Sequence, residues 1–486
     1  VGLHMTASGY TRTRSRPPTR PILVVANREP YVHVQTDSGI QCQTPAGGVT
    51  AALDPILRSL GGTWVGHGNG DADRDTVDEY DRIMVPPADP SYTLRRVWLT
   101  PEEEEGYYLG FANGALWPLC HIAYTRPVFD RSQWETYVEV NRRFAAAVAQ
   151  EAPRKSLVFV QDYHFALLPK YLRQLRDDLA IGQFWHIPWP NPDVFAICPW
   201  KEEILEGLLA NDLLGFHIQH DCNNFLATVG QEVEARIDRE NFSIARKGNK
   251  TKVLPFPISV DYPALEEQAL GNEHQEEVRS WQHKLNLGNE AISVGVDRMD
   301  YTKGLLERID AIDRFLTQHP KWKGKFVHIQ VAVPSRSPVP AYQRLDRELN
   351  AKADACNQKH PGSIRLVQEH VSQAGVQALY QLANVCQVSS LHDGMNLVAK
   401  EFVATRTDEQ GVLILSPFTG AARELTDAIL VNPYAIDDLV EALPVALEMS
   451  EKEQKRRMRK MRQMVREHDI HYWARRILSE IGRASR

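Results

Sequence analysis

The chain has 486 residues, 43% hydrophobic and 24% charged, with a formal net charge of −6. This length is too great for one compact core and predicts two domains with a cleft between them. The composition is that of a soluble globular protein, and the negative charge argues against nucleic acid as a partner.

The first 19 residues are predicted to lie outside the fold. The opening VGLHM is interpreted as a tag remnant, and TRTRSRPPTRP then indicates a disordered, basic, proline-rich tail. No apolar run approaches the roughly 18 residues that cross a bilayer, and no secretory signal precedes the first strand. We therefore expect a cytoplasmic protein without a membrane partner. Six widely spaced cysteines with no CxxC pair predict free thiols rather than disulfides or a zinc site.

Short runs rich in β-branched residues alternate with helical stretches along the rest of the chain. In chain order they are PILVVANR, SLVFVQDYH, IGQFWHIP, DLLGFH, AISVGVDRMD, KFVHIQVAVP, SIRLVQ, NVCQVSSL, GVLILSPF and AILVNP. This alternation predicts parallel sheets with crossover helices. The segment 253–265, VLPFPISVDYPAL, has three prolines and no helical periodicity. We interpret it as a linker between two Rossmann-like domains.

Polar residues directly follow many of the predicted strands. They are Asn27, Arg28, Asp162, Tyr163, His164, His186, His217, Arg336 and the segments 298–303 and 392–396. Any one of them is also explained as an ordinary loop residue. Because ligands of such domains bind outside the carboxyl ends of the strands, the whole set predicts a shared site in the cleft.

The sequence lacks the markers of three common α/β chemistries and favours phosphate binding of another kind. There is no GxGxxG after a strand, no Walker GK[ST] and no GxSxG elbow. Gly47 and Gly48 precede a helical run, where bare backbone and free amides can approach an anion, although such glycines are also common caps. Arg298 and Lys303 share one strand-end loop and offer two cations to a diphosphate.

The stretch SSLHDGMNLVAKEFVA, residues 389–404, predicts a turn at Gly394 followed by a helix whose first amides can hold a phosphate. Glu401 is placed to accept paired hydroxyls of a ribose, and Asp393 those of a sugar ring. A hydrolase pair is disfavoured because eight helical residues span about 12 Å, against about 5–9.5 Å in glycosidases. An equally good explanation from these residues alone is a cap at Asp393 and a surface Glu401.

Several motifs together resemble trehalose-6-phosphate synthase, a family of retaining glycosyltransferases (family 20). They are ANREP, AGGVTAAL, GGTWVG, GFANGALWPLCH, YVEVNRRFA, QDYHFALLP, HIPWPNPDVFAICPWKEEILEGLLANDLLGFH, DRMDYTKG, VPSR, HDGMNLVAKEFVA and DIHYW, between residues 21 and 480. The resemblance implies an α/β GT-B fold, with two Rossmann-like domains facing a central cleft. It implies an acceptor domain at 20–252, a nucleotide-sugar domain at 266–460, and a C-terminal helix at 461–486 that returns to the first domain.

The resemblance also implies a reaction and its site. Glucose passes from a nucleotide-glucose to glucose 6-phosphate with retention, by front-face substitution that needs no enzyme nucleophile, cofactor or metal. The acceptor-binding residues that it implies are Arg28, Trp64, Tyr108, Trp117, Asp162 and Arg336. The donor-binding residues are Gly47, Gly48, Arg298, Lys303, Asp393, Gly394, Met395, Asn396, Leu397, Val398, Ala399, Lys400 and Glu401. The catalytic residues are His186, Arg298, Lys303 and Asp393.

Two departures from this family pattern lie on the acceptor side and keep alternatives open. Glu29 stands where the synthases usually carry an apolar residue, which looks more like glucosylglycerol-phosphate synthase, a user of glycerol 3-phosphate. The loop GHGNGDADRD at 66–75 is longer and more polar than expected. A relative that couples a cyclitol or amine, and a non-catalytic sugar-phosphate sensor, are further alternatives. The donor base (UDP, GDP or ADP) and the oligomeric state stay open, with a homo-oligomer among the expectations.

Overall fold

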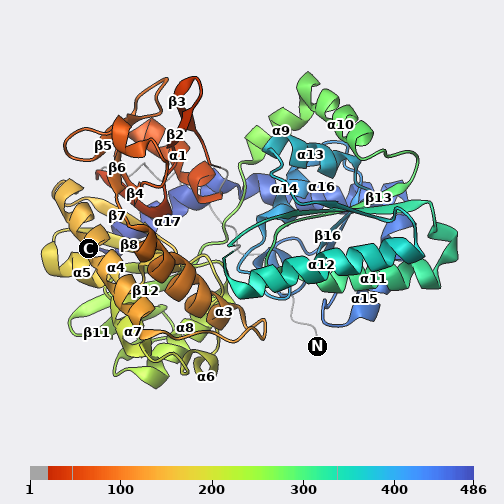
Figure 1. Cartoon of the computed structure of the whole chain (residues 1–486). Helices are drawn as coiled ribbons and strands as arrows, with labels where there is room; N and C mark the ends of the chain where they lie inside the picture. The colour runs from red at the N-terminus through yellow and green to blue at the C-terminus, as the bar shows by residue number, and fades with distance from the viewer. Residues whose placement is uncertain (1–19, 46–47, 337, 486) are drawn as a thin grey trace.

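Two lobes, each built around its own β-sheet, lie side by side in the computed structural model (Figure 1). The structure describes residues 20–45, 48–336 and 338–485. The predicted tail at 1–19 and the predicted phosphate ligand Gly47 lie outside the described residues.

The first lobe contains a ten-stranded sheet with parallel strands at its centre. Its spatial order is β10 (Arg236–Asp238), β11 (Ser243–Arg246), β12 (Asn249–Pro255), β9 (Leu213–Phe216), β8 (Ala180–Phe184), β7 (Leu157–Gln161), β1 (Ile22–Arg28), β4 (Thr63–His67), β6 (Tyr92–Val97) and β5 (Arg82–Val85). Only the pairs β10–β11, β11–β12 and β5–β6 are antiparallel. A separate hairpin joins β2 (Val32–Thr36) and β3 (Gly39–Gln43).

The second lobe contains a six-stranded, wholly parallel sheet. Its order is β15 (Ile364–Val367), β14 (Phe326–Val333), β13 (Ala291–Arg298), β16 (Val385–Val388), β17 (Val412–Leu415) and β18 (Ile429–Leu430). All ten strands that the sequence predicted are present in the two sheets. The predicted α/β class, with two Rossmann-like domains, is confirmed.

Helices cover both sheets. In the first lobe they are α1 (Gly48–Leu60), α2 (Pro101–Glu104), the π-helix η2 (Glu105–Leu116), α3 (Trp117–His121), α4 (Arg131–Glu151), α5 (Leu168–Leu175), α6 (Pro192–Phe195), α7 (Lys201–Leu208) and α8 (Gln219–Glu232), with the 3₁₀ turns η1 (Asp73–Thr76) and η3 (Tyr163–Phe165). In the second they are α9 (Tyr262–Leu270), α10 (Asn272–Lys284), α11 (Leu305–Gln318), α12 (Pro340–Lys359), α13 (Gln373–Leu382), α14 (Leu397–Thr405), α15 (Ile436–Leu447) and α16 (Glu451–Glu467), with η4 (Tyr301–Lys303), η5 (Pro320–Trp322) and η6 (Gly420–Arg423). None of the helices in the described ranges is both long and apolar enough to cross a membrane.

The central strands are buried on both faces, as their continuous apolar runs require. In β1, Leu23 and Val25 pack into one hydrophobic cluster, whereas Ile22 and Val24 pack into another on the opposite face. The second cluster continues into the other lobe, so one apolar core joins the two domains. The polar residues that follow the strands are therefore held on a rigid base.

The chain returns to the first lobe at its C-terminus, where α17 (Ile470–Ala484) packs against β7, β8 and β9 (Figure 1). The indole N–H of Trp473 donates to the Phe256 carbonyl at 3.1 Å. A Cβ on Gly182 would lie 2.3 Å from Cγ1 of Ile481, so only glycine permits this close approach. The sequence predicted one helix over 461–486, but the structure has two: α16 packs on α14 in the second lobe, and the chain changes lobe after Glu467.

The predicted linker at 253–265 begins inside a strand and ends inside a helix. β12 extends to Pro255 and pairs with β9 in the first sheet, and α9 begins at Tyr262. Residues 256–261 between them have no regular secondary structure. The exact domain boundaries stay a prediction.

Candidate active site

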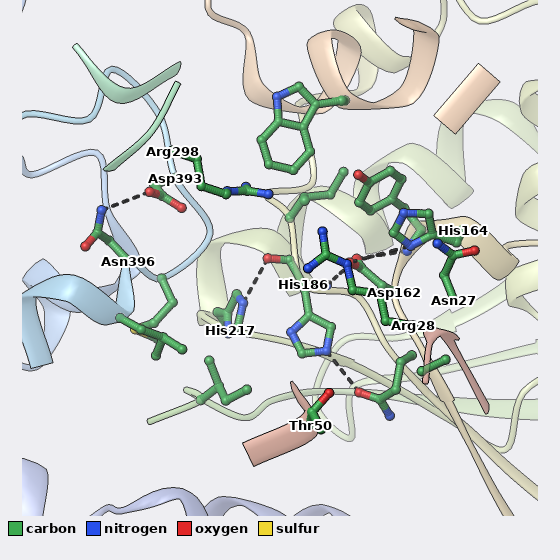
Figure 2. Close-up of a pocket in the computed structure, with 18 of the residues that line it drawn as sticks. Asn27, Arg28, Thr50, Asp162, His164, His186, His217, Arg298, Asp393 and Asn396 are labelled. Atoms are coloured by element: carbon green, nitrogen blue, oxygen red, sulfur yellow. Dashed lines mark hydrogen bonds and ion pairs between the residues drawn. The ribbon is translucent and has the colours of Figure 1, made fainter. Parts of the chain in front are cut away.

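One cavity of about 490 Å³ lies where the strand ends of the two sheets face each other (Figure 2). Arg28 comes from the end of β1, Asp162 follows β7, His186 follows β8, and Arg298 ends β13. The predicted site residues that line it are Arg28, Trp64, Tyr108, Trp117, Asp162, His186, Arg298, Lys303, Arg336, Asp393, Met395, Asn396, Leu397, Val398 and Glu401. The structure thus brings together most of the residues singled out from the sequence.

A few predicted donor residues do not line the cavity. Ala399 is fully buried inside α14. Lys400 directs its ammonium group away from the cavity, to the Ile258 carbonyl at 2.8 Å and to Glu424 Oε2 at 2.6 Å. Gly394 has a packing role, because a Cβ there would lie 2.4 Å from the His186 carbonyl oxygen.

Three arginines from both lobes surround the phenol of Tyr108. This tyrosine belongs to the π-helix η2, an uncommon geometry that is frequent at functional sites. Burial raises the pKa of the Tyr108 hydroxyl, but the positive charges of Arg336, Arg28 and Arg298 outweigh burial and lower it overall. Such a concentration of positive charge beside a phenol is suited to an anionic ligand. Trp117 lies beneath two of the cations, with Arg336 at 4.0 Å and Arg298 at 5.6 Å from its ring centre.

Arg336 is fixed by partners from both lobes. Its guanidinium donates to Asp300 Oδ2 at 3.3 Å and to the Tyr342 hydroxyl at 2.6 Å, both in the second lobe. It also reaches the Tyr163 hydroxyl of the first lobe at 3.4 Å. Its backbone φ of 50° is unusual for a residue other than glycine. An anion bound to Arg336 therefore contacts a side chain whose position depends on both domains.

Asp162 is a largely buried carboxyl at the floor of the cavity. Its Oδ1 accepts the backbone N–H groups of Tyr163 at 2.9 Å and His186 at 3.1 Å. Burial outweighs these hydrogen bonds and raises the pKa of Asp162 to about 7. Its own φ of 73° turns the chain sharply out of β7.

The raised pKa of Asp162 predicts a stability cost that grows with pH. The unfolded chain ionises this carboxyl near pH 4 and the folded chain near pH 7, so raising the pH between these values favours unfolding. We expect Asp162→Asn to be more stable than the wild type by roughly 2–4 kcal/mol at pH 8. Thermal unfolding at pH 4 and pH 8 tests this, since the advantage must shrink toward pH 4. A Tm difference independent of pH would contradict it.

Two histidines in the cavity are kept neutral by burial. Burial lowers the pKa of His186 well below its usual value and that of His217 to about 3. His186 Nε2 donates to Gln161 Oε1 at 3.0 Å, which leaves Nδ1 as an acceptor, and His217 Nε2 donates to the His186 carbonyl at 2.9 Å (Figure 2). These rings are therefore oriented hydrogen-bonding groups rather than cations.

Lys303 and Asp393 form an ion pair on the second lobe, with 2.5 Å between Nζ and Oδ2. Asn396 Nδ2 at 3.1 Å and the Ser390 hydroxyl at 3.2 Å donate to the same oxygen. Burial alone would raise the pKa of Asp393, but Lys303 and these donors lower it to about 2. Asp393 is thus ionised at neutral pH, with Oδ1 still able to accept hydrogen bonds.

The first turn of α14 borders the cavity, but not all of its amides are free. The Asn396 side chain accepts the backbone N–H of Ala399 at 3.3 Å as an N-cap. Leu397 and Val398 line the cavity. Glu401 accepts a hydrogen bond from the Tyr380 hydroxyl at 3.1 Å, and burial raises its pKa. The alternative of a surface Glu401 is wrong, since the side chain is partly buried in the cavity wall.

Several lining residues were missed by sequence reasoning. They are Thr50, His121, Gln161, Ile187, Ile258, Val296 and Asp297. Gln161 and Asp297 are polar residues within apolar strands, and this feature of the sequence could have identified them as lining residues. His121 ends α3, and its contact with the cavity depends on how η2 folds.

Glu29, the departure from the family pattern on the acceptor side, does not line the cavity. Its side chain is buried and pairs with Arg96 on β6 at 2.7 Å. Among the residues that the structure describes, no group of three or more His, Cys, Asp or Glu side chains is placed to bind a metal ion.

The two Rossmann-like domains and their shared, cation-rich cavity define a glycosyltransferase of the GT-B class. The family model of glycosyltransferase family 20 matches residues 20–483. The chain therefore belongs to glycosyltransferase family 20, and it is a retaining glycosyltransferase.

Individual relatives agree with this assignment. The trehalose-6-phosphate synthase of Mycobacterium marinum is 39% identical, over 95% of this chain and 93% of that protein. The solved structure of a UDP-forming α,α-trehalose-phosphate synthase from Burkholderia xenovorans, in complex with glucose-6-phosphate, is 30% identical with a TM-score of 0.84, over 95% of this chain and 99% of that one. A solved structure from E. coli, bound with UDP-2-fluoro glucose, is 29% identical with a TM-score of 0.84, over 95% of this chain and 99% of that one.

Proposed function

We propose that this enzyme transfers glucose from a nucleotide-glucose, UDP-glucose in the first place, to glucose 6-phosphate, and forms α,α-trehalose 6-phosphate and the nucleoside diphosphate. The relatives in the same family support this reaction, and so does the charge distribution of the cavity. All six cysteines are free, which is typical of a reducing compartment, and we propose that the enzyme works in the cytoplasm.

The observation that carries the proposal is the cluster of Arg28, Arg336 and Arg298 around Tyr108, in the same cavity as the Lys303–Asp393 ion pair. A phosphorylated acceptor needs cations and hydroxyl donors at one end and a place for its nucleophilic hydroxyl at the other. We assign the acceptor phosphate to Arg28, Tyr108 and Arg336. Asp162 then accepts a hydroxyl of the acceptor sugar, and Trp117 forms the wall beneath the phosphate.

We assign the donor to the second lobe. Arg298, Lys303 and the first turn of α14 face the diphosphate, and Gly47 and Gly48 stay further ligands that the resemblance implies. Glu401 accepts the ribose hydroxyls through the oxygen that Tyr380 leaves available. Asp393 and His186 bind the hydroxyls of the glucose that is transferred.

The proposed mechanism is front-face substitution. The bond between the glucose anomeric carbon and the diphosphate breaks, while the acceptor hydroxyl forms its bond on the same face and gives its proton to the departing phosphate oxygen. Arg298 and Lys303 balance the charge that grows on the leaving group, so we propose that no metal is needed. The neutral histidines and the ionised Asp393 orient hydroxyls and form no covalent intermediate.

Arg28→Ala is expected to weaken acceptor binding selectively. Loss of one charge-assisted contact to the phosphate should raise the KM for glucose 6-phosphate about 10- to 100-fold, with the KM for the donor within about twofold of the wild type. Steady-state kinetics with each substrate varied in turn measure the two values. The exposed Arg314, which pairs with Asp437, provides the control variant Arg314→Ala. A change confined to the donor KM would contradict the assignment.

The function is tested by release of nucleoside diphosphate from UDP-, GDP- or ADP-glucose with glucose 6-phosphate or glycerol 3-phosphate, in the presence of EDTA. We expect turnover with glucose 6-phosphate and UDP-glucose. A preference for glycerol 3-phosphate would overturn the acceptor, and a requirement for added metal would overturn the role given to the cations. No turnover with any pair would favour a sugar-phosphate sensor.

A further inference from the structure

A buried charged cluster lies directly behind Arg28. Glu29, Arg96 and Asp73 are 1%, 0% and 0% exposed, which is rare for charged side chains unless they are paired. Arg96 Nε lies 2.7 Å from Glu29 Oε2, and Arg96 Nη2 lies 2.8 Å from Asp73 Oδ1. One guanidinium thus bridges two carboxyl groups.

Both carboxyl groups also accept backbone N–H groups from separate segments. Glu29 Oε1 accepts the amide of Asn69 at 3.3 Å. Asp73 accepts the amide of Gly70 at 2.6 Å and that of His33 at 2.7 Å. The cluster therefore connects the end of β1, the strand β2 and the loop 66–75. The two departures from the family pattern, Glu29 and this loop, are parts of one structure.

Arg96 uses its remaining N–H groups on the same segments. It donates to the Asp73 carbonyl at 2.9 Å, the Thr76 hydroxyl at 2.8 Å and the Tyr31 carbonyl at 3.1 Å. It also donates to His33 Nδ1 at 2.8 Å. One buried side chain thus holds together the segment after β1, the strand β2 and the turn η1.

Arg28 itself is held from both sides. Its carbonyl accepts the indole N–H of the fully buried Trp64 at 3.1 Å, and the next residue along the chain is Glu29. The loop is packed tightly here, since a Cβ on Gly66 would lie 3.3 Å from the Glu29 Cα. The backbone that carries the Arg28 guanidinium into the cavity has little freedom to move.

We propose that Glu29, with Arg96 and Asp73, is a positioning residue that fixes Arg28 and so sets the distance between the acceptor phosphate and the donor. This inference rests on the proposed function. In glucose 6-phosphate the phosphate and the anomeric hydroxyl lie at opposite ends of a ring, whereas in glycerol 3-phosphate the hydroxyls lie closer to the phosphate. A rigid phosphate site therefore selects acceptors by length, because small displacements of a reacting atom cost much of the rate.

Burial and the neighbouring Asp73 raise the pKa of Glu29 to about 9, so the cluster holds one proton and is neutral at pH 7. The hydrogen bonds of Glu29, rather than its charge, then maintain the structure. Glutamine has the same shape without the charge. Its oxygen can accept from Arg96 Nε and its amide can donate to Asp73, as the protonated carboxyl does, so Glu29→Gln is the conservative variant that should preserve function.

The test is steady-state kinetics of Glu29→Ala. We expect the KM for glucose 6-phosphate to rise about tenfold, the donor KM to stay within about twofold, and the preference for glucose 6-phosphate over glycerol 3-phosphate to narrow. Glu29→Gln should remain within about threefold of the wild type. The matched control is Glu151→Ala, which removes a buried carboxyl paired with Arg82 at 3.0 Å, away from the cavity, and should change neither KM.

If Glu29→Ala does not fold, Thr76→Val removes one acceptor of Arg96 at the edge of the cluster and should raise the acceptor KM about threefold. Equal changes in both KM values, unchanged discrimination between the two acceptors, or a Glu29→Gln variant as impaired as Glu29→Ala would overturn the proposal. A wild-type enzyme that does not use glucose 6-phosphate would instead overturn the proposed function, and that result is obtained before any variant is made.

Discussion

Replacing Arg298 by alanine is expected to lower kcat about 100- to 1,000-fold, with a smaller change in the acceptor KM. Arg298 ends β13, and its guanidinium projects into the cavity over Trp117 (Figure 2). It faces the site that we assign to the leaving diphosphate, where negative charge grows as the glycosidic bond breaks. A preorganised cation acts most strongly at such a position, because it stabilises the transition state more than the bound substrate.

The same kinetics separate this role from a structural one. Arg314→Ala again serves as the control, because Arg314 is exposed and lies far along α11 from the cavity. A variant Arg298→Lys should recover part of the rate, since it restores a charge without the forked geometry. Unchanged kcat in Arg298→Ala would contradict the mechanism.

Asp393→Asn is the second substitution with a large expected effect, a fall in kcat/KM on the order of 100-fold. The substitution removes the charge that pairs with Lys303 and replaces an acceptor oxygen that we assign to the transferred glucose. Lys303 is nearly buried, so it would be left without its charged partner, which is costly. The kcat/KM of the purified variant is measured with the acceptor saturating and the nucleotide-glucose varied.

The pH dependence of the free energy of unfolding tests the Lys303–Asp393 ion pair independently of the kinetics. Asp393 ionises near pH 2 in the folded chain and near pH 4 in the unfolded chain. Its ionised form therefore contributes about 2 kcal/mol above pH 4, and this contribution is lost as the pH falls toward 2. We expect Asp393→Asn to have a lower Tm than the wild type at pH 7 and a similar Tm near pH 2. A constant Tm difference would contradict the pairing.

The fold was largely predictable because its central strands have strong apolar, β-branched runs. AISVGVDR and KFVHIQVAV, for example, form the strands β13 and β14. Six strands of the first sheet were not predicted: β4, β5, β6, β10, β11 and β12. RIMV and RID are short and half exposed, and the end of β12 was interpreted as part of the linker. The break between α16 and α17 was also missed, since both helices have good helical sequences and only Asp469, an N-cap, indicates the restart.

The candidate site was predictable where a residue follows a strand, and less so elsewhere. Arg28, His186 and Arg298 follow from their positions at strand ends. The buried pairing of Glu29 could not be predicted, because its partner Arg96 lies 67 residues away and meets it only through the pairing of β1, β4 and β6. The Lys400 side chain pairs with Glu424, which becomes a neighbour only in the folded chain, so the sequence did not indicate where its ammonium group lies.

The most direct test of the central claim is NMR of the product formed from UDP-glucose and glucose 6-phosphate labelled with ¹³C at its anomeric carbon. We predict that the labelled carbon becomes glycosidic and that both anomeric centres of the product are α. A β centre at the transferred glucose would contradict retention. A labelled carbon that remains a free reducing end would show transfer to another hydroxyl, and would contradict the proposed reaction.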